Sequence, residues 1–191
     1  MASKILCFSG SARKDSINKK LALLACNTIK MCGAEATYID LADFNLPLYD
    51  GDLESHSGIP DNAYKLKDIF CAHDGLFIAS PEHNSTYSAL LKNTIDWISR
   101  ITEDGLPPLS AFTNKIAAIG AVSPGALGGY RGLIPLRLLL SNIGVVVVPS
   151  QIAITDGFNA FNADGSFLNE DHHKLLRTTV ESLLKTKIHP A

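Results

Sequence analysis

KILCFSGSARKDSIN, residues 4–18, contains the clearest indication of the fold. Lys4–Ser9 is a short apolar run that predicts a buried strand, and from Ile17 onward apolar residues recur at helical spacing. A short polar loop opened by Gly10 joins the two, and Ser16 stands where a helix N-cap is expected. The stretch therefore predicts a β-strand, a loop and an α-helix in succession.

The same alternation continues to the end of the chain. It predicts further strands at 35–40, 75–80, 115–122 and 145–148, and further helices at 64–72, 90–100, 133–140 and 171–184. Short apolar strands that alternate with helices are typical of a parallel sheet covered on both faces, with right-handed crossovers. We therefore expect residues 1–191 to form a single α/β domain, a flavodoxin-like three-layer sandwich with a five-stranded parallel sheet in the order 2-1-3-4-5.

Composition excludes several classes of function. The chain has 17 Lys and Arg against 19 Asp and Glu, a formal net charge of −2, so it lacks the broad basic field of a nucleic-acid binder. It has no apolar run long enough to span a membrane. Its four cysteines form no CxxC pair, which predicts reduced thiols and a cytoplasmic protein.

His172 and His173 are adjacent on a predicted helix and have no evident third ligand, so we predict a solvated pair and no metal site.

Three loops are placed to bind a ligand, because ligands of such sheets lie beyond the carboxyl ends of the strands at the switch point between strands 1 and 3. The loop at 9–18 has the side chains of Ser11, Arg13, Ser16 and Asn18 at a helix N-terminus, which suits a phosphate monoester. It contains neither GK[ST] nor GxGxxG, so a mononucleotide is expected rather than a dinucleotide. Taken alone, this loop fits an ordinary βα turn with a serine cap equally well.

The spacing of Cys7 and Arg13 also resembles that of a thiolate phosphatase. Cys7, however, lies inside the apolar strand, where its thiol should be buried and protonated, and no Asp-Pro general-acid loop accompanies it. A core cysteine is therefore the favoured interpretation.

The other two loops favour a flat heterocyclic ligand. PEHNST at 81–86 offers backbone groups and the amide of Asn84, which suit the mixed donor and acceptor edge of a pyrimidine ring. SPGALGGYRG at 123–132 places Gly125, Gly128 and Gly129 where the backbone approaches a ligand closely or adopts positive φ.

Taken together, GSARKDSIN, SPEHNSTYSALLKNTIDW and SPGALGGYRG resemble the NADPH-dependent FMN reductase family, which includes chromate, quinone and azo-dye reductases. The resemblance covers nearly the whole chain. It implies phosphate contacts by Ser11, Arg13, Ser16 and Asn18. It implies flavin-ring contacts by two further groups: Pro81, Glu82, His83, Asn84, Ser85 and Thr86, and then Ser123, Gly125 and Gly128.

The chain departs from the family pattern in the second loop. His83 stands where a Tyr is common, and Thr86 replaces a Ser. We expect His83 to be an exposed loop residue covering the ring, the alternative being a pH-sensitive influence on turnover. LLKNTIDW at 90–97 has helical apolar spacing and is expected in the core or at a subunit contact.

The resemblance implies bound FMN, NADPH or NADH as co-substrate, and a small-molecule electron acceptor such as a quinone or flavin. Because the cofactor supplies the chemistry, no catalytic side chain is assigned. Residues 46–60 are expected to form a surface loop, with Tyr49 and the part from Asp50 to Pro60 at the pocket rim. A homodimer or homotetramer with shared pockets is expected. The alternatives are a flavodoxin-type electron shuttle, against which the small net charge weighs, and a flavin-binding regulatory module.

Overall fold

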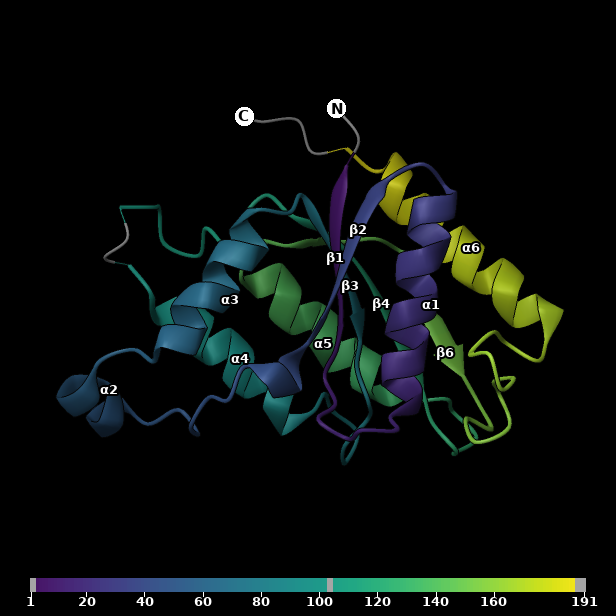
Figure 1. The fold of residues 1–191 in the computed structure, drawn as a ribbon, viewed down its shortest axis with the longest axis horizontal. Helices are drawn as coiled ribbons and strands as arrows, with labels where there is room; N and C mark the ends of the chain where they lie inside the picture. The colour runs from purple at the N-terminus through teal and green to yellow at the C-terminus, as the bar shows by residue number, and fades with distance from the viewer. Residues whose placement is uncertain (1–2, 103–104, 188–191) are drawn as a thin grey trace.

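The computed structural model describes residues 3–102 and 105–187, and Figure 1 shows how its elements are arranged. All strand pairs are parallel, and the order β2-β1-β3-β4-β5 confirms the predicted topology. The strands are β1 (Lys4–Ser9), β2 (Glu35–Asp40), β3 (Gly75–Ala79), β4 (Ile116–Val122), β5 (Val146–Val147) and β6 (Ile152–Ile154). The helices are α1 (Ile17–Met31), the 3-10 turn η1 (Leu41–Asp43), α2 (Gly51–Ser57), α3 (Asp61–Cys71), α4 (Ala89–Arg100), α5 (Tyr130–Asn142) and α6 (Glu170–Lys185).

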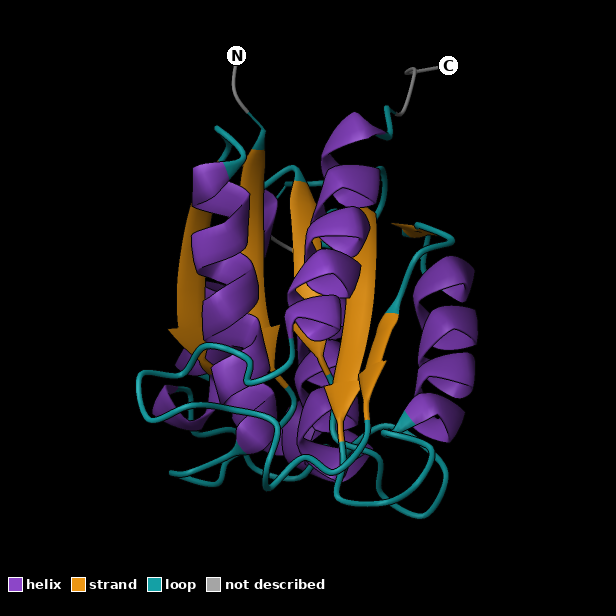
Figure 2. Ribbon diagram, turned by 90° about the vertical axis from the view of Figure 1, so that its right-hand side faces the viewer, coloured by secondary structure: helices purple, strands orange, loops and turns teal. Residues whose placement is uncertain are grey.

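Helices cover both faces of the sheet. Alternate residues of β1 divide between two cores: Ile5 and Cys7 pack with α1 and α6, while Leu6 and Phe8 pack with α3, α4 and α5. This alternation follows from the pleat of a strand, which directs successive side chains to opposite faces. Figure 2 shows that the strand arrows point to one edge, where the long loops gather. The three predicted binding loops all leave the sheet at this edge.

The fifth position of the sheet differs from the prediction of one strand at 145–148. Two short strands share that position: β5 pairs with Ile116 and Ala117, and β6 pairs with 120–122 of β4. Pro149 lies between them and has no backbone N–H to donate to the ladder, which accounts for the interruption. β6 was not predicted because it is only three residues long and follows the polar residues 150–151.

The segment 46–60, predicted as a surface loop, lies at the surface but contains a helix that was not predicted. Residues 51–57 form α2, which begins at Asp50, whose side chain accepts from the backbone N–H groups of Asp52 and Leu53. The arm before it is fixed to α4, because Asn93 Nδ2 and Trp97 Nε1 both donate to the Pro47 carbonyl. Figure 1 shows α2 at the far end of the molecule from α6.

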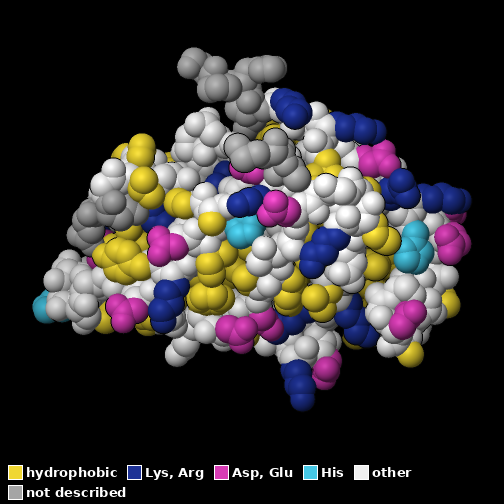
Figure 3. All heavy atoms as spheres, turned by 45° about the horizontal axis from the view of Figure 1, so that its top comes forward, with side chains coloured by type: hydrophobic (Ala, Val, Ile, Leu, Met, Phe, Trp, Pro, Cys, Tyr) yellow, Lys and Arg dark blue, Asp and Glu magenta, His cyan; other side chains and the backbone are white. Residues whose placement is uncertain are grey.

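Trp97 is fully buried, as expected for the 90–97 helix. Helices α3, α5 and α6 each begin one to three residues before their predicted starts. No helix in residues 3–102 and 105–187 is both long and apolar enough to cross a membrane. On the face seen in Figure 3, Lys and Arg side chains are interspersed with Asp and Glu, which agrees with the small net charge.

Candidate functional site

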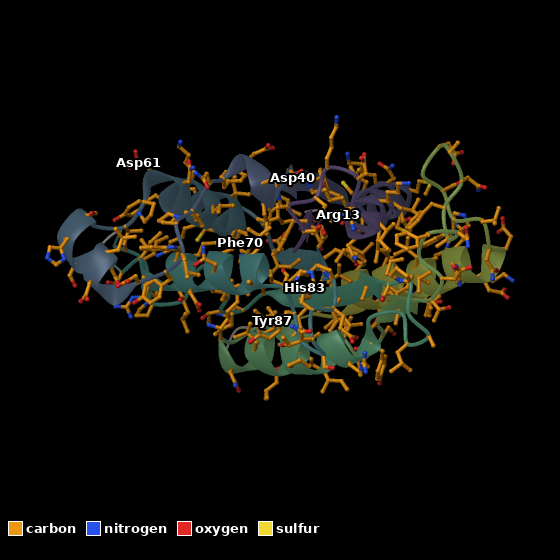
Figure 4. All side chains as sticks on the ribbon, turned by 90° about the horizontal axis from the view of Figure 1, so that it is seen from below. Arg13, Asp40, Asp61, Phe70, His83 and Tyr87 are labelled. Atoms are coloured by element: carbon orange, nitrogen blue, oxygen red, sulfur yellow. The ribbon has the colours of Figure 1, made fainter. Side chains whose placement is uncertain are left out.

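A pocket of about 350 Å³ opens at the carboxyl edge of the sheet, where the loops after β1, β3 and β4 meet. Figure 4 looks onto this edge and shows Arg13 and His83 near the centre of the molecule, with Asp61 far to one side. Of the residues predicted from sequence to bind a ligand, eight line the pocket: Ser11, Arg13, Ser16, Asn18, Pro81, Glu82, His83 and Ser123.

The loop after β1 is fixed at its start by two long-range hydrogen bonds. The Gly10 N–H donates to the Ala79 carbonyl at 2.9 Å, and the Ser88 hydroxyl donates to the Gly10 carbonyl at 2.5 Å. A Cβ on Gly10 would lie 2.9 Å from Ser88 Oγ, so glycine allows this close approach. Ser88 also caps α4 through the N–H of Leu91. The hydrogen bond from Ser88 to Gly10 connects the first binding loop to the residues just after the second. It was not predicted, because the two residues are 78 positions apart.

The end of the same loop presents hydrogen-bond donors toward the pocket. Ser16 Oγ accepts from the N–H groups of Asn18 and Lys19, which makes it the predicted cap of α1. Ser11 Oγ accepts from the N–H of Arg13 at 3.3 Å. Both hydroxyls therefore keep a hydrogen to donate. Among residues 3–102 and 105–187, the backbone N–H groups of 14–17 find no protein acceptor.

Charge at the loop favours an anion. The exposed guanidinium of Arg13 lines the pocket, and no carboxylate in the described part of the chain pairs with it. The N-terminus of α1 adds the positive end of the helix dipole. Two hydroxyls, free N–H groups, a cation and a helix N-terminus together fit a phosphate group, which accepts several charge-assisted hydrogen bonds.

Asn18 has a partner that the sequence did not reveal. Its Nδ2 donates to the Val122 carbonyl and its Oδ1 accepts from the Val122 N–H, both at 2.9 Å. Asn18 is 3% exposed, so these bonds lie in the interior. The side chain thus clamps the start of α1 to the end of β4 and holds the first and third binding loops together. Its predicted contact with a phosphate stays a prediction.

The loop at 81–86 closes in a tight turn. His83 and Thr86 exchange both backbone hydrogen bonds, at 2.8 and 3.1 Å, and Asn84 and Ser85 between them have φ of 50° and 66°. Two successive positive φ values are typical of a type I′ turn, and for Ser85 they are unfavourable. His83, Asn84 and Ser85 are exposed. The turn therefore presents its tip outward, at a cost in backbone strain of the kind that gathers at functional sites.

Glu82 connects this loop to α5. Its carboxylate lies 2.7 Å from a guanidinium nitrogen of Arg131 and accepts from the Gly132 N–H at 3.3 Å. A Cβ on Gly132 would meet the Thr86 carbonyl at 3.0 Å, so the helix needs glycine to approach the loop. The Glu82 side chain is thus committed to positioning the loop, although it lines the pocket.

The glycines at 125–129 were predicted to approach a ligand closely or to adopt positive φ. Gly128 and Gly129 do adopt positive φ, 61° and 88°. A Cβ on Gly128 would clash with the Ile154 backbone at 2.7 Å, so its close neighbour is β6. A Cβ on Gly125 would have only Ser123 Oγ nearby, at 3.6 Å. Five predicted ligand contacts do not line the pocket: Asn84, Ser85, Thr86, Gly125 and Gly128.

Six lining residues were not predicted: Asp15, Ile17, Lys20, Val122, Pro124 and Phe158. All but Phe158 lie in or beside the predicted loops. Phe158 comes from the segment after β6, and neither motif nor periodicity marks it. Its only signal is TDGF at 155–158, where an Asp-Gly pair predicts a turn that exposes the next residue.

Other sequence interpretations are decided by the surroundings of the side chains. Tyr49 does not line this pocket: its hydroxyl donates to Glu54 and its ring packs edge-on against Trp97 at 5.1 Å. Cys7 is fully buried, and a hydrogen bond with Cys26 together with burial raises its pKa well above the usual value, which removes the phosphatase alternative. His172 and His173 are not a solvated pair, because both rings pack edge-on against Phe167.

Comparison with known proteins agrees with this geometry. The model of the NADPH-dependent FMN reductase family matches residues 3–159. An NAD(P)H-dependent FMN reductase of Pseudomonas aeruginosa is 32% identical over 182 residues, 94% of this chain and 92% of the relative. A 2-hydroxy-1,4-benzoquinone reductase of a Burkholderia species is 31% identical over 95% of this chain and 94% of the relative.

The solved structures give the same result. The flavoenzyme NAD(P)H:(acceptor) oxidoreductase of Paracoccus denitrificans superposes with a TM-score of 0.80 at 28% identity, covering 96% of each chain. The fold, the order of the binding loops and the match over most of the sequence therefore agree, and the chain belongs to the NADPH-dependent FMN reductase family.

Proposed function

We propose that the protein is an FMN-containing reductase that takes reducing equivalents from NADPH or NADH and passes them to a quinone, flavin or similar small-molecule acceptor. The observation that carries this proposal is the pocket lined by Ser11, Arg13 and Ser16 at the switch point of the sheet, whose donors and positive charge suit an anion. The family match and the flavoenzyme relatives support the same activity.

The residues of the pocket suit FMN with its phosphate at the loop after β1 and its ring toward the 83–86 turn. Arg13 and the hydroxyls of Ser11 and Ser16 would hold the phosphate, since each has a donor free for it. The turn at 83–86 would face the flavin ring. The N–H groups of Asn84 and Ser85 have no acceptor within the described chain, so they are available to polar atoms of the ring. Ser123 would line the pocket between the phosphate and the flavin ring.

Bound FMN supplies hydride acceptance from a nicotinamide and electron delivery to the acceptor. The chain's own residues bind and orient. Glu82, through Arg131, fixes the 81–86 loop, and Asn18 fixes the loop after β4 relative to the phosphate loop. Because the flavin would carry the redox chemistry, we assign no side chain of the protein as an essential acid or base.

A steady-state assay tests the proposal. We expect the purified yellow protein to oxidise NADPH or NADH when benzoquinone is supplied, with parallel lines in double-reciprocal plots because donor and acceptor would use the same ring face in turn. A yellow protein that oxidises neither donor would favour the flavodoxin-type shuttle or a regulatory module. A colourless protein that takes up no FMN would contradict all three flavin-binding hypotheses: the reductase, the shuttle and the regulatory module.

We propose that the whole chain acts as one FMN-binding domain in a homodimer or homotetramer. Four large apolar side chains support assembly, because they form an exposed stripe on and before α5: Leu127, Tyr130, Ile134 and Leu138. Sedimentation velocity should give two or four chain masses, and a sedimenting monomer at micromolar concentration would oppose assembly.

The unpaired state of all four cysteines and the use of a nicotinamide donor support a cytoplasmic location.

A further inference from the structure

Phe158 is an aromatic side chain left on the surface beside the pocket. It lines the pocket and is 71% exposed. Its neighbours in the same segment behave differently, since Phe161 and Phe167 stack on each other at 5.1 Å. No ring contact joins Phe158 to another aromatic side chain in residues 3–102 and 105–187. An unpartnered aromatic ring at the mouth of a polar pocket offers a stacking face to a ligand.

The backbone holds Phe158 in this position. The Gly157 N–H donates to the Ser123 carbonyl at 3.1 Å, and the Ser123 N–H donates to the Ile154 carbonyl at 3.0 Å. A Cβ on Gly157 would lie 2.6 Å from Ile17 Cδ1, so only glycine brings the segment this close to α1. The preceding Asp156 has a φ of 48°. Phe158 is therefore exposed on a segment that backbone hydrogen bonds and close packing hold against the pocket wall.

The charges around Phe158 complement a phosphorylated ligand. Lys20 and Arg13 line the same pocket and are exposed, and Asp15 is the only exposed carboxylate among the lining residues. The Lys20 ammonium lies 5.7 Å from the centre of the Phe161 ring, which belongs to the same segment after β6 as Phe158. Arg13 would be taken by the FMN phosphate in the proposed function, whereas Lys20 remains for a second anion.

We infer that Phe158 and Lys20 bind the adenosine-pyrophosphate half of the nicotinamide dinucleotide, the purine stacking on the ring and a phosphate meeting the ammonium. This inference rests on the proposed function. The nicotinamide must reach the flavin ring near the 83–86 turn, whose Asn84, Ser85 and Thr86 lie outside this pocket. The adenosine half is then free to lie over the cationic end. A quinone acceptor carries no phosphate and no purine, so it matches this surface less well.

Kinetics with three electron donors test the inference. Wild-type and Phe158→Ala holoproteins are compared with NADPH, with NADH and with reduced nicotinamide mononucleotide, which lacks the adenosine phosphate. We expect Phe158→Ala to raise the KM for both dinucleotides by roughly tenfold, as for loss of one base-stacking face, with kcat little changed. Its kcat/KM for the mononucleotide should equal that of the wild type. Phe158→Trp should restore the dinucleotide KM, and Lys20→Gln should raise it by a factor that shrinks at high salt.

Met31→Ala is the matched control, because Met31 is an apolar residue 78% exposed at the opposite end of α1. Equal losses with all three donors would overturn the inference by placing Phe158 at the reacting ring. Loss of bound flavin in Phe158→Ala would overturn the inference by assigning the Phe158 ring to FMN. An unchanged KM for both dinucleotides would also overturn it, because Phe158 would then have no role in donor binding. A wild-type protein inactive with every donor would instead refute the proposed function.

Discussion

In an Arg13→Ala, Ser16→Ala double variant, we expect the purified protein to retain little flavin and its Kd for FMN to rise by two or more orders of magnitude. Each substitution removes a donor to the phosphate, and hydrogen bonds to charged groups contribute about 1.5–3 kcal/mol each. The donors lie together in one pocket, and within the described residues no carboxylate forms an ion pair with Arg13. Fluorescence titration of the apoprotein with FMN measures the change.

Two further variants separate phosphate binding from helix stability. Ser16→Ala also removes the cap of α1, which costs about 1 kcal/mol. Ser16→Asp keeps an acceptor for the capped N–H groups but cannot donate and repels a phosphate, so it should fold normally and still lose FMN. Lys14→Ala removes an equal charge from the adjacent exposed residue, which does not line the pocket. Undiminished FMN affinity in the double variant, or an equal loss in Lys14→Ala, would contradict the phosphate site.

We expect Asn18→Ala to lower the free energy of unfolding by about 2–4 kcal/mol. It removes two hydrogen bonds to Val122 and leaves the N–H and carbonyl of that residue without partners in the interior. For a chain of this size, the loss corresponds to a fall in Tm of roughly 5–15 °C. Thermal unfolding of the apoprotein measures the effect without a contribution from bound flavin.

Asn27→Ala is the matched control for this variant, because Asn27 is exposed on the same helix. Its stability should stay within about 0.5 kcal/mol of the wild type, since exposed substitutions have small effects. Asn18→Asp keeps an acceptor for the Val122 N–H but loses the donor to the Val122 carbonyl. At neutral pH its stability should therefore lie between those of the wild type and Asn18→Ala, or below both. An Asn18→Ala protein as stable as the wild type would show that the clamp between α1 and β4 does not contribute to folding.

The local part of the site could be predicted from sequence, and the contacts between distant segments could not. Ser16 was predicted as a cap and is one, because capping depends on residues two and three positions away. Asn18 and Val122 are 104 positions apart, and Ser88 and Gly10 are 78 apart, so no local pattern reveals either pair. The glycines of the third loop were recognised as unusual, but the backbone that Gly128 approaches belongs to β6, which was itself missed.

Two errors have the same physical origin. The chain between Leu46 and Pro60 looks irregular by composition, yet Asp50 begins a helix there and α4 holds the preceding arm through Pro47. Phe158 looks like one aromatic residue among several, and only its fixed backbone and its exposure beside the pocket distinguish it. In both regions, tertiary contacts decide what local composition leaves open.

Anaerobic mixing of the purified holoprotein with NADPH or NADH, followed by absorbance near the visible flavin bands, shows directly whether a nicotinamide donor reduces the bound flavin. We predict that at least one of the donors bleaches the bound flavin and that benzoquinone then restores the absorbance, over repeated cycles. A protein whose bound flavin stays oxidised in excess NADPH and in excess NADH, while dithionite reduces it, would contradict the assignment as a nicotinamide-dependent reductase.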